Sequence, residues 1–129
     1  MTNLKMPNMS YDNLRELLEG SRGKTKKIAY ATHARLSEGG VVYVYHHGNT
    51  IAAVQPDRVS MSNAGYHTKT TAHRLDLIAY ANGVGRVRIR DFTMRVEPVE
   101  GLEYMIEFGP YGFADGSDHV MDGKVTVYK

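Results

Sequence analysis

The sequence predicts an α+β protein, a mainly antiparallel sheet (meander plus C-terminal hairpin) packed by one main helix, with a short N-terminal helix. Three observations carry this prediction. Apolar residues alternate with period two over much of the chain after residue 27, short turn signals separate these runs, and only two segments have helical spacing. We find no internal repeat of 20 to 50 residues and no heptad pattern.

The composition is that of a single globular unit. The chain has 129 residues, of which 42% are hydrophobic and 23% charged, and its formal charge is only +2. Cysteine is absent, which excludes a disulfide scaffold, a thiolate zinc site and a cysteine nucleophile, and fits a reducing cytoplasm. No run of about 18 apolar residues and no signal-peptide pattern occurs, so we expect a soluble protein without a membrane partner.

The N-terminal helix is predicted over residues 11–19. Ser10 suits the N-cap, Gly20 suits the C-terminal stop, and leucines recur at helical spacing between them. The following "SRGKTKK" combines glycine with four basic residues and is typical of a solvated connector. We therefore predict an N-terminal helix and basic connector over 1–26, and a single α+β domain over 27–129.

Four strands with short turns are predicted next. They are a run from Lys27 closed by "SEGG", then "VVYVYHH", "TIAAVQ" and "RVSMSN". Gly48-Asn49 suits a type II′ hairpin turn, because glycine supplies a positive φ at the first central position. Pro56-Asp57 suits the centre of a type I turn. Strands in succession joined this way predict an antiparallel meander.

The main helix is predicted within "AHRLDLIAYANG". Thr71, Leu75, Ile78 and Asn82 fall on one stripe, and Gly83 is placed to end the helix. The following "GRVRIRDFTMRVEP" is typical of one long strand, but its apolar residues change face near residue 91. Because side chains alternate strictly along a strand, this reversal predicts a bulge or bend there.

The C-terminal third continues the sheet. "LEYMIEFG" is a strand pattern, whereas "GPYGFADGSD" is too rich in glycine, proline and aspartate for regular structure. The final "HVMDGKVTVYK" predicts a hairpin, because Asp-Gly between alternating residues favours a type I′ turn.

The stretch "GYHTKTTAHRLD", residues 65–76, is the first candidate site. A helix start has unpaired N–H groups and a positive dipole end, which favours an anion, and the threonines there are candidate N-caps. Two interpretations stay open: a phosphate or nucleic-acid site, or capping with a solvated helix face. The candidate ligand residues are His67, Thr68, Lys69, Thr70, His73 and Arg74, with Asp76 and Tyr80 on the same helix face as Lys69 and His73.

The second candidate is an arginine strand, formed by Arg86, Arg88 and Arg90. At strand rise these three residues span about 13 Å, which suits contacts along a nucleic-acid backbone. Tyr43 and Tyr45 share a strand face and could add stacking rings. The alternative is that the arginines protect an exposed sheet edge against pairing.

No metal, cofactor or catalytic residue is predicted. His46 and His47 are adjacent and would point to opposite faces of a strand, and no His-Glu-x-x-His spacing occurs. "DGSD" lacks the later glutamate of an EF-hand loop. We considered His67 and His73 as an acid/base pair, but sequence alone does not bring their rings together. We expect the protein not to be an enzyme.

Residues 43–78 resemble an element of small uncharacterised proteins of tailed bacteriophages. In that pattern a strand ends in His-Gly, two further strands follow, and a Gly-aromatic-x-Thr-x-Thr-Thr-x-x-Arg run leads into a helix. The matching positions here are His47, Gly48, Ile51, Gly65, Tyr66, Thr68, Thr70, Thr71 and Arg74. The resemblance implies a phage gene and the cytoplasm of an infected bacterium, with no established reaction.

Two functional hypotheses from different classes follow. The first is a phage accessory protein that binds a protein partner or assembles with itself, through an interface that includes Tyr43, Tyr45, Tyr111 and Phe113. The alternative is nucleic-acid or phosphate-ligand binding through the basic helix start and the arginine strand. We favour the first slightly, because the net charge is low.

Overall fold

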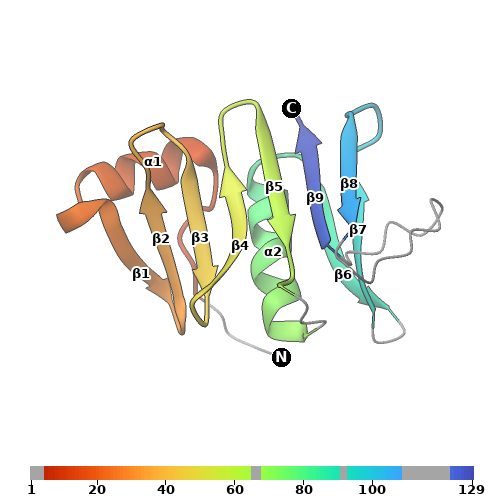
Figure 1. Ribbon diagram of the computed structural model, residues 1–129, viewed down its shortest axis with the longest axis horizontal. Helices are drawn as coiled ribbons and strands as arrows, with labels where there is room; N and C mark the ends of the chain where they lie inside the picture. Colours follow the sequence, from red (N-terminus) through yellow and green to blue (C-terminus); the bar gives the residue numbers. More distant parts are fainter. Residues whose placement is uncertain (1–4, 65–67, 91–92, 109–122) are drawn as a thin grey trace.

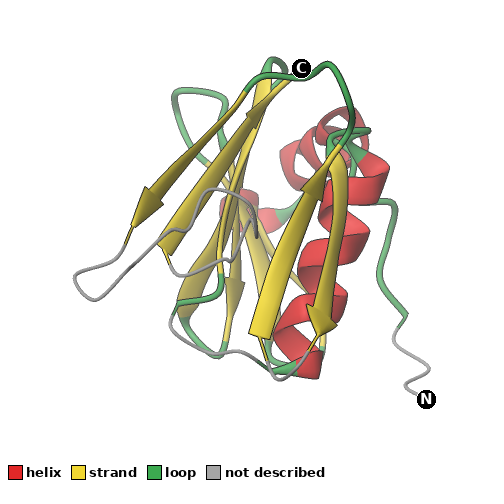
Figure 2. Cartoon of the chain, turned by 90° about the vertical axis from the view of Figure 1, so that its right-hand side faces the viewer, coloured by secondary structure: helices red, strands yellow, loops and turns green. Residues whose placement is uncertain are grey.

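The protein has two layers, a seven-stranded antiparallel sheet and a second layer of two helices and a two-stranded hairpin (Figures 1 and 2). The computed structural model describes residues 5–64, 68–90, 93–108 and 123–129. The sheet has the order β1 (Thr25–Ala29), β2 (Thr32–Leu36), β3 (Val42–His46), β4 (Asn49–Val54), β5 (Arg58–Ser62), β9 (Gly123–Tyr128) and β8 (Tyr104–Phe108). The second layer contains α1 (Tyr11–Glu19), α2 (Lys69–Ala81), β6 (Gly85–Arg90) and β7 (Thr93–Pro98). This architecture confirms the predicted fold class.

The core lies between the two layers. The large sheet contributes side chains from one face to this core, as the alternating burial along β2 and β3 shows. The two helices and the β6–β7 hairpin contribute the other side of the core. Their buried side chains, none more than 3% exposed, include Leu14, Leu18, Leu75, Ile78 and Val87. In the described residues, the helices and the β6–β7 hairpin all lie on this face of the large sheet (Figure 2). The opposite face, which we call the open face, carries the alternate side chains.

The N-terminal helix is as predicted. Its N-cap Ser10 accepts a hydrogen bond from the Asn13 N–H, and Gly20 is the C-cap. Leu14 and Leu18 are fully buried where α1 packs on β2 and β3. The basic segment that follows forms a 3-10 turn (Arg22–Lys24) and then enters β1.

The prediction of one strand from Lys27 to the "SEGG" turn was wrong. Two strands, β1 and β2, form a hairpin that turns at Tyr30-Ala31, with Ala29 opposite Thr32. Ala31 adopts a positive φ of 51°, which an alanine rarely supplies, so the sequence contains no ordinary turn signal there. The meander therefore has five strands, β1 to β5, instead of four.

The β3–β4 turn lies one residue earlier than predicted. Its two central residues are His47 and Gly48, both with positive φ, as a type I′ turn requires. The His47 N–H donates to the Ala31 carbonyl oxygen over 2.8 Å, which connects this turn to the β1–β2 turn. The predicted turn at Pro56-Asp57 is confirmed, with a Gln55 N–H to Arg58 carbonyl bond of 2.9 Å.

The expected long strand over residues 85–98 is an antiparallel pair, β6 and β7, in which Arg90 lies opposite Thr93. Residues 91–92, where the bend was predicted, lie outside the described residues. The pairing explains the change of apolar face, because Val87 lies opposite Val96 and Ile89 opposite Met94. Folding back puts all four side chains on one face. The pair also begins tightly, since a Cβ on Gly85 would collide with the Glu97 carbonyl oxygen.

The C-terminal strands are inserted next to β5. The predicted strand in "LEYMIEFG" is β8, and β9 runs antiparallel to β5 on one side and to β8 on the other. The glycine-rich segment and the first half of the predicted Asp-Gly hairpin, residues 109–122, lie outside the described residues. The large sheet therefore ends with β9 between β5 and β8 (Figure 1).

Candidate functional site

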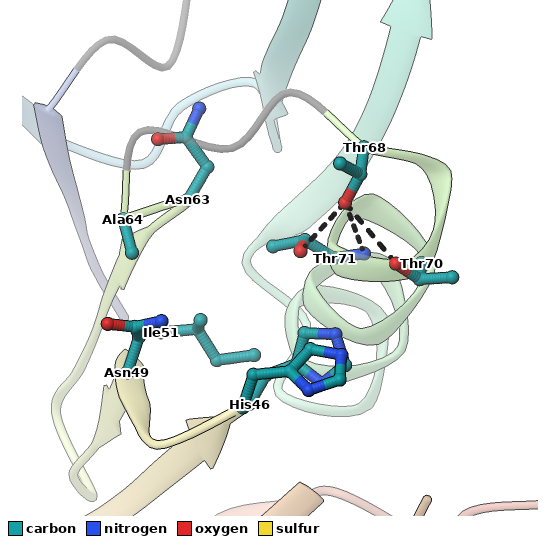
Figure 3. A pocket seen from close by; sticks show the side chains of 9 residues that line it. His46, Asn49, Ile51, Asn63, Ala64, Thr68, Thr70 and Thr71 are labelled. Carbon is teal, nitrogen blue, oxygen red and sulfur yellow. Dashed lines mark hydrogen bonds between the residues drawn. The ribbon is translucent and has the colours of Figure 1, made fainter. Parts of the chain in front are cut away.

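The start of α2 borders a pocket of about 320 Å³ between the β3–β4 turn and the helix (Figure 3). Most of its described lining residues carry a polar group, although the larger part of the exposed lining surface is apolar, and none of them carries a carboxylate. The described lining residues are His46, His47, Asn49, Ile51, Asn63, Ala64, Thr68, Thr70 and Thr71. The described part of the candidate stretch over residues 65–76 therefore borders a pocket, which the sequence pattern alone did not reveal.

Thr68 is the N-cap of α2, one of the three threonines predicted as candidates. Its Oγ1 accepts a hydrogen bond from the Thr71 N–H over 3.3 Å and contacts the hydroxyls of Thr71 and Thr70 at 3.0 and 3.3 Å (Figure 3). The Thr71 side chain is buried, whereas Thr70 is exposed at the pocket rim. Capping therefore explains Thr68 and Thr71, but it leaves Thr70 on the surface.

Arg74 lies inside the protein and does not flank the helix start as the phosphate hypothesis expected. The residue is 4% exposed, and all three of its nitrogens donate to neutral oxygens. Nε donates to Thr32 Oγ1 at 2.6 Å, Nη1 to the Thr70 carbonyl at 2.9 Å and Nη2 to the Tyr30 carbonyl at 3.0 Å. Arg74 thus fastens α2 to the β1–β2 turn.

His46 joins the same buried cluster. The residue is 4% exposed, and its Nδ1 lies 3.4 Å from Thr32 Oγ1. Burial lowers the pKa of His46, and the charge of Arg74 lowers it further. The His47 ring lies 4.3 Å from the His46 ring, centroid to centroid, because the strand ends at His46 and His47 belongs to the turn. The described residues contain no group of three metal-ligating side chains.

Lys69 is exposed on α2 and His73 is half-buried on the same helix. Asp76, on the same helix face in the sequence prediction, accepts hydrogen bonds from Arg86 of β6. The two Arg86 bonds are 2.9 and 2.7 Å long, and the Val87 N–H adds a third bond of 2.8 Å. Burial of Asp76 opposes ionisation, but these bonds outweigh it and hold the pKa below its usual value.

The arginine strand does not form one surface with Tyr43 and Tyr45. Val87 packs in the core, so Arg86 and Arg88 face away from it, on the outside of the second layer. The tyrosines alternate with buried Val42 and Val44 and therefore lie on the open face of the large sheet. Arg86 is paired with Asp76, and Arg88 contacts Glu97 at 3.2 Å. His67, Tyr111, Phe113 and the Arg90 side chain lie outside what the structure describes.

The open face instead brings the tyrosines beside cations of β1 and β2. Strand register aligns Lys27 with His33 and His33 with Tyr45, and it aligns Arg35 with Tyr43. We call these five residues, Lys27, His33, Arg35, Tyr43 and Tyr45, the basic-aromatic face. Neighbouring strands are about 4.8 Å apart and same-face residues about 7 Å apart along a strand, so the five form a compact patch.

Arg35 holds this patch together. Its guanidinium carbon lies 5.5 Å from the centre of the Tyr43 ring, and its Nε donates to the Tyr45 hydroxyl over 3.3 Å. Within the described ranges neither Lys27 nor Arg35 forms an ion pair. Three more exposed cations, Arg22 and Lys24 before β1 and Lys26 within it, extend the positive charge along the sheet edge. Sequence reasoning missed this cluster because it treated β1 and β2 as one strand.

The fold and these surfaces define a class: a two-layer α+β protein in which no described helix or strand covers the second face of the large sheet. A family model described as Kyanoviridae Gp96 protein matches residues 6–117. The chain belongs to this phage family, which confirms the expected relation to small tailed-phage proteins. Comparison with curated proteins and with solved structures gave no match. No helix in the described part of the chain is long and apolar enough to span a membrane.

Proposed function

We propose that this phage protein acts by binding, without catalysis, and that its basic-aromatic face binds single-stranded nucleic acid in the infected bacterial cell. One observation carries the proposal: Lys27 and Arg35, which form no ion pair within the described residues, lie in register with two tyrosines on the open face of the large sheet. Sheet faces that bind single strands combine these elements, cations for the phosphates and rings for the bases.

The charge on this side of the molecule is local. The whole chain carries only +2, but Lys27 and Arg35 have no ion-pair partner in the described residues, and three further exposed cations lie in β1 or just before it. Arg86 and Arg88, by contrast, are neutralised by carboxylates. The positive charge that could attract a nucleic acid therefore lies on the open face and not on the arginine strand.

The rings favour an unpaired strand over a duplex. Tyr43 and Tyr45 are half-buried and lie two residues apart on the same face of β3, a spacing of about 7 Å along the strand. Bases of a single strand can stack on such rings, whereas the bases of a duplex are already stacked on each other. Each stacked base contributes about 1 to 3 kcal/mol.

The first test replaces Arg35 with alanine and measures binding of a fluorescent single-stranded oligonucleotide by anisotropy at several salt concentrations. Loss of one phosphate contact should weaken binding about 5- to 30-fold in low salt and reduce the slope of log affinity against log salt by about 0.7. Arg88→Ala is the matched control, because it removes the same charge on the second layer. Equal effects of the two variants, or salt-independent binding, would contradict the proposal.

The second test separates stacking from charge. Tyr45→Leu keeps an apolar side chain but removes the ring, and it should weaken single-strand binding roughly 5- to 100-fold. Tyr80→Leu is the control, because Tyr80 is 66% exposed on α2 and lies outside the basic-aromatic face. Unchanged binding by Tyr45→Leu, or stronger binding of a duplex than of a single strand by the wild type, would rule out the stacking platform.

Protein binding or self-assembly is a second candidate, supported by a different observation. Tyr104 and Met105 on β8 are 42% and 50% exposed, and tyrosine and methionine are enriched at protein interfaces. If this strand forms an interface between copies, sedimentation should show a dimer that Met105→Lys dissociates. A monomer at all concentrations would eliminate self-assembly and leave only a separate protein partner.

A further inference from the structure

We infer that a bound single strand extends from the basic-aromatic face across the large sheet to a second stacking site at Tyr128 of β9. The inference rests on the proposed function, because it adds a subsite to the same face. A second cation–ring pair carries it: the guanidinium carbon of Arg58 lies 5.5 Å from the centre of the Tyr128 ring. Arg35 lies at the same distance from the Tyr43 ring.

Tyr128 and Arg58 lie on the open face. In β9 the Val127 side chain is fully buried in the core, so the Tyr128 side chain lies on the opposite side of the sheet. In β5 the Val59 side chain is likewise fully buried, which puts Arg58 on the open face, directly opposite Tyr128 in the strand register. Both residues are partly exposed. The ring sites on β3 and on β9 therefore share one face.

Small side chains lie between the two ring sites. Strand register places Ala53 of β4 opposite Tyr43, and Ser60 of β5 opposite Ala53. Both small residues are partly exposed. Side chains this short stand lower than the tyrosine rings on either side, so a nucleic-acid strand has room to cross from β3 to β9 close to the sheet.

The spacing sets the length of strand that reaches both rings. Tyr43 and Tyr128 are three strands apart, about 14 Å, and one same-face step apart along the strands, about 7 Å (Figure 1). The direct separation is then about 16 Å. Nucleotides stacked as in a duplex rise about 3.4 Å each, so the two bases are roughly five positions apart in a stacked strand and fewer in an extended one. A dinucleotide reaches one ring site, whereas an octanucleotide reaches both.

The second site supplies a ring without net charge. Arg58 donates to both carboxylate oxygens of Asp57, over 3.3 Å from Nε and 3.2 Å from Nη2. Arg35 forms no ion pair within the part of the chain that the structure describes. Loss of the Tyr128 ring should therefore lower the affinity without changing its salt dependence, whereas loss of Arg35 changes both.

The test measures binding of an eight-nucleotide oligothymidylate to Tyr128→Leu by fluorescence anisotropy at several salt concentrations. The affinity should fall roughly 5- to 100-fold, and the slope of log affinity against log salt should stay that of the wild type. Tyr80→Leu is the matched control, because Arg86 lies over the Tyr80 ring and is likewise paired with a carboxylate, but in the second layer. This control should bind as the wild type does. Unchanged affinity of Tyr128→Leu, or an equal loss in the control, would overturn the inference.

Backbone-amide NMR of the wild-type protein gives a second test that depends on no variant. A thymidine dinucleotide should shift the signals of β2 and β3, where phosphate and ring contacts combine. The octanucleotide should also shift the signals of Arg58 and Tyr128. An octanucleotide that binds but leaves the signals of β5 and β9 unchanged would overturn the inference.

Failure of the second site and failure of the proposed function give different results. If only the Tyr128 site is wrong, the octanucleotide still binds and Arg35→Ala still weakens binding, while Tyr128→Leu has no effect. If the nucleic-acid function is wrong, the wild type binds neither oligonucleotide in low salt, and both proposals are overturned.

Discussion

At the scale of single residues, the most informative group is the buried cluster of Arg74, Thr32 and His46. Thr32 Oγ1 accepts from Arg74, donates to the Tyr30 carbonyl over 2.7 Å and lies within reach of His46. Three polar side chains are therefore satisfied almost entirely by each other and by the backbone. Such a network is sensitive to any added charge, because all three side chains are buried and bulk solvent screens them little.

Acid should destabilise the protein through His46. Its pKa is lowered in the folded state by burial and by Arg74, so below about pH 6.5 the unfolded chain binds a proton that the folded chain resists. Stability should then fall as the pH drops from 7 through 6, as measured by urea unfolding at each pH.

Two variants identify the responsible histidine. His46→Gln should flatten this part of the pH profile, whereas His33→Gln, which changes an exposed histidine, should leave it unchanged. If the stability of His46→Gln still falls between pH 7 and pH 6 as in the wild type, another group causes the acid sensitivity.

At the scale of elements, Asp76 connects α2 to β6. Its carboxylate accepts two bonds from Arg86 and one from the Val87 backbone, and its side chain is 17% exposed. Arg86 in turn lies 4.9 Å from the Tyr80 ring centre. One residue of the helix thus fixes both the position of the strand and the orientation of its first arginine.

Asp76→Asn should destabilise the protein by about 1 to 3 kcal/mol, because it removes the charge from a half-buried, multiply bonded carboxylate. Glu97→Gln is the control, since the Arg88–Glu97 pair is about half exposed and should contribute less than about 1 kcal/mol. Chemical unfolding measures both. Equal losses would mean that the Asp76 bonds do not couple helix and strand.

Elements with strong local signals were predictable from the sequence. Ser10 caps α1 and Thr68 caps α2, because hydroxyl side chains before an apolar helix pattern have few other roles. The Tyr30-Ala31 turn was not predictable, since neither residue favours a positive φ or a tight turn. In the sequence of β6 and β7, the change of the apolar residues from one strand face to the other was visible. Alternation alone does not distinguish a bend in one strand from a chain that folds back as a second strand.

The site was less predictable than the fold. Proximity of Thr68 and Thr70 to a helix start followed from spacing, whereas burial of Arg74 depends on the β1–β2 turn, 42 residues earlier. The basic-aromatic face depends on the same hairpin, because only the pairing of β1 with β2 brings Lys27 into line with Tyr45. Long-range strand register is not encoded in local alternation.

At the scale of the whole molecule, one core serves both helices. Leu14 and Leu18 of α1 and Leu75 and Ile78 of α2 belong to the same buried cluster as the sheet residues. The N-terminal helix is therefore a covering element of the large sheet. Its neighbour along the chain, β1, forms the edge strand that contributes Lys27 to the basic-aromatic face.

Leu14→Ala should destabilise the entire protein by about 2 to 5 kcal/mol, because it leaves a cavity beneath the helix. Circular dichroism and tyrosine fluorescence should report a single, coincident thermal transition at a lower temperature. Two separate transitions would indicate that α1 detaches before the sheet unfolds. Leu17→Ala, at a half-buried position of the same helix, is the milder control.

The bond from His47 to Ala31 has a consequence for variation among related proteins. The two residues that it joins, Ala31 in one hairpin turn and His47 in the other, both have a positive φ, so a β-branched residue at either position would strain the backbone. A single inserted residue in one turn would move its peptide away from the other. Substitutions at these two positions should therefore favour glycine or asparagine, and changes in length should occur in both turns together or in neither.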